Sequence, residues 1–311
     1  MFVHLHWHSH YSLLEAIGTP KALVAKAKEL GMEAIALTDY NGMYWCIEFY
    51  EEAKKQGIKP LLGVEVGLVH NRFQKEKNER AGTIVLIAAT YQGYQHLLHL
   101  VSHANLEWYN HMARIDFDLL KQYSAGLIAI VWGIQSILWT MILQEEQPKK
   151  ITETRSLIQE IIWKEACYLE LVAQDEKKHT PYRLVNTALH RLAQETASPE
   201  IVTSNFHYIQ KDDKKAFEVA LAIKDGKRIY DEGKRTFEGN GYILSEEEVR
   251  AMLKHNGYEA DEIVHLIETT QYLADQCTVE LPLGKILFPT YQPPEAIVAL
   301  YEQHKNTLIV S

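Results

Sequence analysis

Three histidines alternate with other residues near the start of the sequence. Residues 2–8 read Phe-Val-His-Leu-His-Trp-His, and the apolar, β-forming residues 2–5 predict a strand. Side chains on a strand alternate between its two faces, so His4, His6 and His8 are expected to point the same way. Neutral imidazole is a good ligand for zinc, manganese or iron, and a His-x-His pair can hold one ion. The alternative is a polar strand end with solvated histidines, and the spacing alone leaves both interpretations open.

Short apolar segments alternate with amphipathic segments up to residue 208. Strands are expected over 2–5, 33–38, 58–69, 83–89, 127–131, 167–172 and 201–204. Helices are expected over 20–30, 43–56, 91–108, 152–164 and 181–197. This alternation predicts an α/β fold with a mostly parallel sheet, either open or closed into a barrel. No Gly-x-Gly-x-x-Gly turn follows the first strand, which favours a TIM-like barrel over a dinucleotide-binding fold.

Polar residues occur at or just after the ends of several predicted strands. They are His6, His8, Asp39, Glu65, Asn205 and His207. In a barrel of parallel strands the carboxyl ends meet at one end of the barrel, where loops build the functional site. The sequence therefore predicts that these side chains gather at that end.

Beyond residue 208 the pattern changes to helices only. Helices are expected over 212–224 and 261–277, and Ser245 followed by three glutamates predicts a capping box at the start of another. Residues 281–289 are expected to be extended, with a short final helix after Pro293-Pro294. We therefore divide the chain into a barrel over 1–210, a helical extension over 211–280 and an exit segment over 281–311.

Composition limits the classes of protein that fit. The 311 residues carry a formal net charge of −9, and no run of Lys or Arg is longer than a pair. A protein that binds DNA mainly through phosphates should have a basic face, so contact with DNA is expected to be indirect. Three widely spaced cysteines favour reduced thiols, and no apolar run could span a bilayer. We expect a soluble, cytoplasmic protein with no membrane partner.

Several motifs resemble one known family. His6-x-His8-Ser9 with Tyr11-Ser12-Leu13-Leu14, Ala36-Leu37-Thr38-Asp39, Gly63-Val64-Glu65 and His207-Tyr208 occur in order along the chain. Together they resemble the polymerase-and-histidinol-phosphatase (PHP) domain, in the version found at the amino terminus of the bacterial DNA polymerase III alpha subunit. The resemblance implies a distorted (β/α)7 barrel with a C-terminal helical extension. It also implies a site for up to three metal ions at the carboxyl ends of the strands.

The resemblance carries the metal site over only in part. Residues that match family ligands, with Glu15 in place of the usual Asp, are His6, His8, Glu15, Glu65 and His207. Positions where family ligands are replaced, by poor ligands for a zinc-like ion, are Tyr40, Thr83, Gly133 and Asn205. Asp39 lies near the same site. The resemblance thus implies a degenerate centre, with zinc or manganese at reduced occupancy or with no metal at all.

Two functions are compatible with these residues. In the first, the chain is the PHP domain of a replicative polymerase and has a structural role. Its partners would be the rest of the polymerase and a proofreading exonuclease subunit. In the second, it retains metal and acts as a 3′–5′ exonuclease or another phosphoesterase. A free-standing histidinol-phosphate phosphatase is disfavoured, because the tail after Tyr208 has no use there. The palm is absent, so this chain is not expected to copy DNA by itself.

Overall fold

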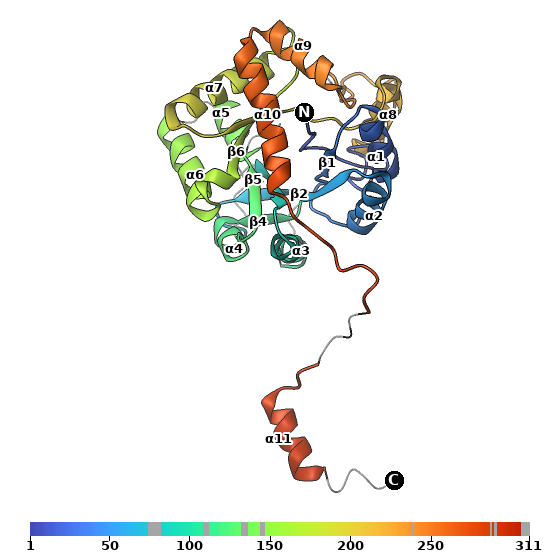
Figure 1. The fold of residues 1–311 in the computed structure, drawn as a ribbon, viewed down its shortest axis with the longest axis vertical. Coiled ribbons are helices and arrows are strands. Elements are labelled where there is room, and N and C mark those ends of the chain that lie inside the picture. The colour runs from blue at the N-terminus through green and yellow to red at the C-terminus, as the bar shows by residue number, and fades with distance from the viewer. Residues whose placement is uncertain are drawn as a thin grey trace. The chain divides into compact units, whose positions relative to one another are not determined.

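The chain forms two units, which we describe separately. The computed structural model describes residues 1–73, 82–107, 112–131, 136–143, 147–237, 239–286, 288 and 291–305. The first unit is Met1–Glu280, and the second is Leu281–Ser311. The second unit contains helix α11 (Glu295–His304), none of whose residues is buried. The first unit contains all the strands, surrounded by helices (Figure 1).

The strands form one curled sheet. They are β1 (Ala34–Leu37), β2 (Lys59–Val69), β3 (Gly82–Ala88), β4 (Arg114–Asp116), β5 (Leu127–Ile130), β6 (Cys167–Val172) and β7 (Glu200–Thr203). Their order is β1-β2-β3-β5-β6-β7, and β4 pairs with β2. The α/β fold with a barrel-like sheet is confirmed, but the sheet is not uniformly parallel.

Strand β3 runs antiparallel to both of its neighbours, β2 and β5, whereas every other strand pair is parallel. Hydrophobic patterning did not predict this reversal, nor the short strand β4, because an apolar strand has the same pattern in either direction. The reversal has a consequence for the site. The amino end of β3 lies beside the carboxyl ends of the parallel strands.

Residues 2–5 are extended but do not form a regular strand, which corrects the prediction. The backbone N–H of Ala36 donates to the carbonyl of His4 at 2.8 Å, and that of Thr38 donates to Trp7 at 3.0 Å. His4 and Trp7 are three residues apart, whereas their partners Ala36 and Thr38 are two apart. This mismatch interrupts a regular ladder as a β-bulge does. Trp7 also forms a parallel bridge with Phe206, just after β7. The first segment thus lies between β1 and the residues that follow β7.

Helices α1 to α7 surround the sheet (Figure 1). They are α1 (Pro20–Glu29), α2 (Cys46–Gln56), α3 (Tyr91–Leu106), α4 (Phe117–Gln122), α5 (Ile137–Leu143), α6 (Pro148–Ile161) and α7 (Thr180–Thr196). Short 3-10 turns cover Lys164–Ala166 and Lys211–Asp213. Helix α5 was not predicted. Within the described residues, each helix is too short or too polar to cross a lipid bilayer.

The helical C-terminal part consists of α8 (Lys214–Lys224), α9 (Glu246–Asn256) and α10 (Ala260–Gln276), all near the predicted positions. The predicted capping box at Ser245 is present, with Glu248 as its partner. Helix α10 packs against the first residues of the strands: Leu273 lies in the same apolar cluster as Ala34, and Lys59 Nζ donates to the carbonyl of Ala274 at 2.7 Å. Helix α10 therefore covers the amino-terminal end of the barrel and leaves the carboxyl-terminal end for the site.

A loop that contains Gly239 and Asn240 is hydrogen-bonded to Gln174, which follows β6. Gln174 Nε2 donates to the carbonyls of Ser204 at 3.2 Å and Asn240 at 2.7 Å, and the Asn240 N–H donates to Gln174 Oε1 at 2.8 Å. Gly239 has φ +106°, and a Cβ there would lie 2.4 Å from Gln174 Oε1. Only glycine allows the loop to approach Gln174 this closely.

Candidate metal centre

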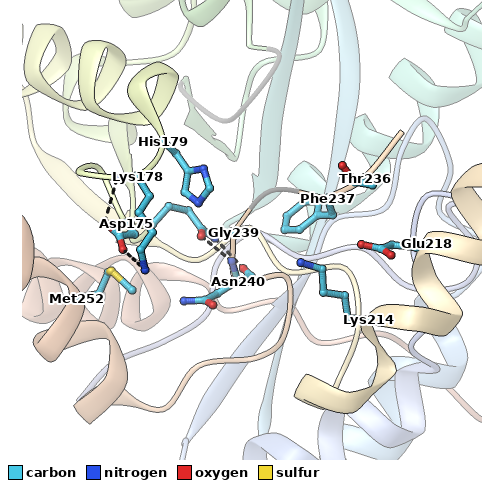
Figure 2. Close-up of a pocket in the computed structure, with 11 residues that line it drawn as sticks. Asp175, Lys178, His179, Lys214, Glu218, Thr236, Phe237, Gly239, Asn240 and Met252 are labelled. Carbon is cyan, nitrogen blue, oxygen red and sulfur yellow. Dashed lines mark hydrogen bonds and ion pairs between the residues drawn. The ribbon is translucent and has the colours of Figure 1, made fainter. Parts of the chain in front are cut away.

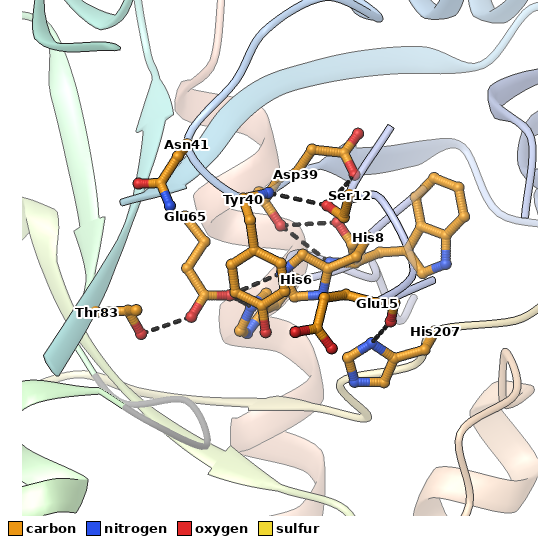
Figure 3. Close-up of polar contacts among 12 residues, drawn as sticks. His6, His8, Ser12, Glu15, Asp39, Tyr40, Asn41, Glu65, Thr83 and His207 are labelled. Atoms are coloured by element: carbon orange, nitrogen blue, oxygen red, sulfur yellow. Dashed lines mark hydrogen bonds and ion pairs between the residues drawn. The ribbon is translucent and has the colours of Figure 1, made fainter. Parts of the chain in front are cut away.

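Three of the predicted ligands meet at the carboxyl-terminal end of the barrel. Glu65 Oε2 lies 2.8 Å from His6 Nε2 and 2.7 Å from His8 Nε2 (Figure 3). All three side chains are buried, and their ligand atoms lie within 4.8 Å of one another. Among the described residues, no other group of histidines, cysteines and carboxylates meets this geometry.

The strands explain why these groups converge. His6 and His8 come from the first segment, which is hydrogen-bonded to β1, and Glu65 comes from β2, which pairs with the other edge of β1. Thr83, near the amino end of the reversed strand β3, donates its hydroxyl to Glu65 Oε1 at 2.5 Å. Both oxygens of Glu65 therefore have partners inside the protein. Thr83, where the resemblance implies that a metal ligand is lost, therefore donates a hydrogen bond to the central carboxylate of Glu65.

Glu170 on β6 is a member of the cluster that the sequence analysis missed. Its Oε1 lies 2.9 Å from His6 Nδ1 and also accepts the hydroxyl of Thr203. Its Oε2 is buried with no hydrogen-bond partner among the described residues. A signal was present: Glu170 is the one charged residue in the apolar strand Cys-Tyr-Leu-Glu-Leu-Val. A lone carboxylate in a fully buried strand needs a partner.

Each ionisable group in the cluster affects its neighbours. Burial alone would lower the pKa of His6, but the Glu170 and Glu65 carboxylates outweigh burial and hold this pKa above its usual range. Burial would raise the pKa of Glu65, but the His6 and His8 rings outweigh it and hold this pKa below its usual range. His4 is different: burial lowers its pKa to about 4, against the opposing effect of its bond to the Leu244 carbonyl. His4 is therefore a neutral core residue outside the cluster.

The donor set fits one divalent cation. Two imidazole nitrogens and one carboxylate are ligands that zinc, manganese and iron accept. The contact between His6 Nδ1 and Glu170 is the kind of outer carboxylate bond that orients metal-binding histidines. His8 Nδ1, like Glu170 Oε2, has no partner among the described residues, so the cluster is not fully satisfied by its own hydrogen bonds. Binding of an ion would require the proton on His6 to leave.

Two further predicted ligands, Glu15 and His207, do not join the cluster. The His207 ring stacks between His8 and Phe217, with centroid distances of 5.3 Å to each. Its Nδ1 donates to the backbone carbonyl of Glu15 at 2.9 Å (Figure 3). The Glu15 carboxylate instead forms ion pairs with Lys224 and Arg235. These two ligand positions therefore have other partners.

The sequence profile of the PHP domain family matches residues 4–174. The chain belongs to the PHP domain family. This PHP chain is 31% identical over 293 residues to the DNA polymerase III alpha subunit of Helicobacter pylori, in an alignment that covers 91% of the chain and 23% of that relative. It is 32% identical over 306 residues to the alpha subunit of Borreliella burgdorferi, with coverage of 94% and 25%. The chain thus spans about a quarter of the length of the curated relatives it matches.

A solved structure from Bifidobacterium adolescentis, provisionally described as a metal-dependent phosphoesterase, also resembles the PHP chain. The TM-score is 0.47 at 12% sequence identity, over 84% of this chain and 98% of that one.

Tyr40 and Asp39 have contacts within the protein that do not require a metal. The ring of the partly buried Tyr40 stacks on His8 with a centroid distance of 4.0 Å, and desolvation raises the Tyr40 pKa well above its usual value, so the phenol stays neutral. Asn205 has φ +44°, and its Oδ1 is buried without a partner among the described residues. Asp39 accepts hydrogen bonds from Ser9 and Ser12 and so holds the loop after His8. Gly133 lies outside the described residues.

Two cavities lie near the PHP site. One, of about 490 Å³, is lined by Glu15, Tyr40, Thr83 and Lys224, and so lies at the mouth of the barrel. The other, of about 520 Å³, lies beside Gly239 (Figure 2). Its Lys178 pairs with Asp175 at 3.1 Å. The first cavity therefore lies beside the candidate metal centre, because Tyr40 stacks on His8 and Thr83 donates to Glu65.

Proposed function

We propose that this chain is the PHP domain of a bacterial DNA polymerase III alpha subunit and acts in DNA replication. One observation carries the proposal: the alignment with alpha subunits covers 91% to 94% of the chain, well beyond the PHP match at 4–174. The helical part over 211–280 is therefore shared with these polymerases. A phosphatase that consisted of a PHP barrel alone would not need it.

The proposed role is mainly structural. The barrel over 1–210 and its helical extension pack against the rest of the polymerase, and the segment over 281–311 leads toward the palm. The cytoplasm is the proposed location. The partners are the remainder of the polymerase and a proofreading exonuclease subunit, while DNA is contacted only indirectly. The net charge of −9 supports the last point, because a strongly acidic chain offers little attraction to phosphates.

The candidate metal centre is proposed to be degenerate. His6, His8 and Glu65 would hold one zinc or manganese ion at reduced occupancy, and Glu170 would orient His6. A bound ion of this kind lowers the pKa of water and polarises a phosphoryl oxygen. The partly buried Tyr40 stacks its ring on His8 and shields that side of the cluster from solvent.

A second candidate function, metal-dependent phosphodiester hydrolysis, is favoured by the convergence of His6, His8 and Glu65. Family proofreading domains act as 3′–5′ exonucleases with such ligands, and His207 and Glu15 would have to join the set. In the structure His207 Nδ1 bonds to the Glu15 backbone and the Glu15 carboxylate has cationic partners. We therefore rank this function second.

Metal content and nuclease activity separate the two functions. The chain would be purified with zinc and manganese supplied, freed of loosely bound ions and analysed by mass spectrometry. A 3′-labelled oligonucleotide would then be tested as substrate, with His6→Ala as the control. The structural proposal expects at most one ion per chain and no cleavage above the control. Two or three ions per chain, with cleavage that His6→Ala abolishes, would establish the exonuclease instead.

A further inference from the structure

The Glu15 carboxylate is surrounded by cationic side chains from the helical extension. Lys224, at the end of α8, donates to Glu15 Oε1. Arg235 Nη1 lies 3.6 Å from Glu15 Oε2. Both oxygens of this carboxylate are therefore paired with positive charges that come from more than two hundred residues further along the chain.

The four charges at this place balance. Arg235 also pairs with Asp225, with Nη2 3.0 Å from Oδ1 and Nε 3.2 Å from Oδ2. Lys224 and Arg235 supply two positive charges, and Glu15 and Asp225 supply two negative charges. Two unit charges equal the charge of one divalent ion. A metal ion on Glu15 would have to displace Lys224 and Arg235 or bind beside them against like-charge repulsion.

These ion pairs are poor candidates for a stabilising role. The side chains of Lys224 and Arg235 are each 41% exposed, and exposed ion pairs contribute little to stability. The location of Lys224 and Arg235 beside the candidate metal centre suggests a role other than stabilising the fold. Lys224 lines the same cavity as Tyr40 and Thr83, and the backbone of Glu15 holds the His207 ring beside His8.

We propose that Lys224 and Arg235 determine how many metal ions this site accepts, by occupying Glu15 in place of an ion. Among the described residues, no lysine or arginine pairs with the His6–His8–Glu65 group, which keeps its ability to bind one ion. The Glu15–His207 side is closed to metal by the two side chains. The proposal deepens the proposed function, since it rests on the degenerate centre described there.

The test counts Mn²⁺ ions bound to the full chain by isothermal titration and by mass spectrometry. The double variant Lys224→Met with Arg235→Gln removes both charges and leaves uncharged side chains, of which Gln is shorter than Arg. We expect it to bind one ion more than the wild type. Adding Glu15→Gln to the double variant should return the count to the wild-type value. A matched control, Lys178→Met with Arg191→Gln, removes two cations of other exposed ion pairs and should leave the count unchanged.

The outcomes for this inference and for the degenerate centre are distinct. If the wild type binds no ion and the double variant binds one, the proposed residual site is wrong and the role of Lys224 and Arg235 stands. If both bind one, the residual site stands and this inference is overturned. Circular dichroism checks the fold. Should the double variant unfold without metal, recovery of its helical signal with Mn²⁺ supports the inference, and no recovery overturns it.

Discussion

Glu65 and Glu15 are both carboxylates at the mouth of the barrel, but their surroundings differ in kind. Glu65 is buried, and its oxygens contact two imidazoles and one hydroxyl. Glu15 is partly exposed, and its oxygens contact an ammonium and a guanidinium. Imidazoles can lose a proton and bind a metal at neutral pH, whereas Lys and Arg stay charged and cannot.

The difference shows two ways in which a protein can satisfy carboxylates arranged at a metal site. On the Glu65 side, the partners His6 and His8 can themselves bind a metal, so the three residues can still form an ion site. On the Glu15 side, the partners are permanent cations, so the charge is already neutralised. The two sides should therefore respond differently when their residues are changed.

The largest effect is expected from Glu65→Gln. This change leaves two imidazoles and Glu170 in a buried cluster without the central charge, and breaking a buried charged pair costs about 3 kcal/mol. The free energy of unfolding, measured with urea, should fall by that amount, and Mn²⁺ binding should be lost. The matched change Glu15→Gln should lower stability by less than about 1 kcal/mol because its pairs are exposed. If Glu65→Gln and Glu15→Gln lowered the free energy of unfolding equally, the Glu65 and Glu15 sides of the site would not differ as proposed.

The sequence predicted one side of this site better than the other. The His-x-His spacing predicts the pairing of His6 and His8, because residues two apart in an extended segment share a side. The same spacing predicted that His4 would point with them, but His4 lies outside the cluster, with its ring bonded to the Leu244 carbonyl. Glu65 follows from its place in a long apolar strand. The partners of Glu15 could not be predicted, since Lys224 and Arg235 lie in separate segments of the helical extension and no local pattern encodes that contact.

Two features of the fold escaped the sequence analysis for a similar reason. The direction of β3 is set by its connection and its neighbours, and strand periodicity is the same in both directions. Glu170 was not predicted, although a single carboxylate within a buried strand is a signal, as it is for Glu65. Local patterns thus predicted elements well, and contacts between distant elements poorly.

Glu170→Gln tests whether the Glu65 side is organised as a metal site. The amide cannot hold His6 as the carboxylate does, and loss of such an outer partner lowers metal affinity by about 10- to 100-fold. The Mn²⁺ dissociation constant from isothermal titration should rise by that factor, with the number of ions unchanged. Glu200→Gln, in the neighbouring strand β7, is the control and should leave affinity alone. An unchanged constant in Glu170→Gln would mean that Glu170 serves packing only.

Thr83→Val should have a smaller effect. The variant keeps the side-chain shape but removes the hydroxyl that donates to Glu65 Oε1 at 2.5 Å. A hydrogen bond to a charged group contributes about 1.5 to 3 kcal/mol, and we expect a loss near the lower value because β3 can adjust. Urea unfolding measures the change. A stability equal to that of the wild type would show that Thr83 does not support the carboxylate, and Glu65 would then depend on the histidines alone.

The smallest effect is expected at Asn205, which is not a member of the His6–His8–Glu65 group. Its φ of +44° lies in the left-handed region, which asparagine and glycine adopt more readily than other residues. Asn205→Ala should therefore lower the free energy of unfolding by about 1 kcal/mol, whereas Asn205→Gly should stay within about 0.5 kcal/mol of the wild type. Neither change should alter the number of bound Mn²⁺ ions. Loss of an ion in Asn205→Gly, which keeps the backbone conformation, would instead make the Asn205 amide a ligand and extend the metal site to the second side.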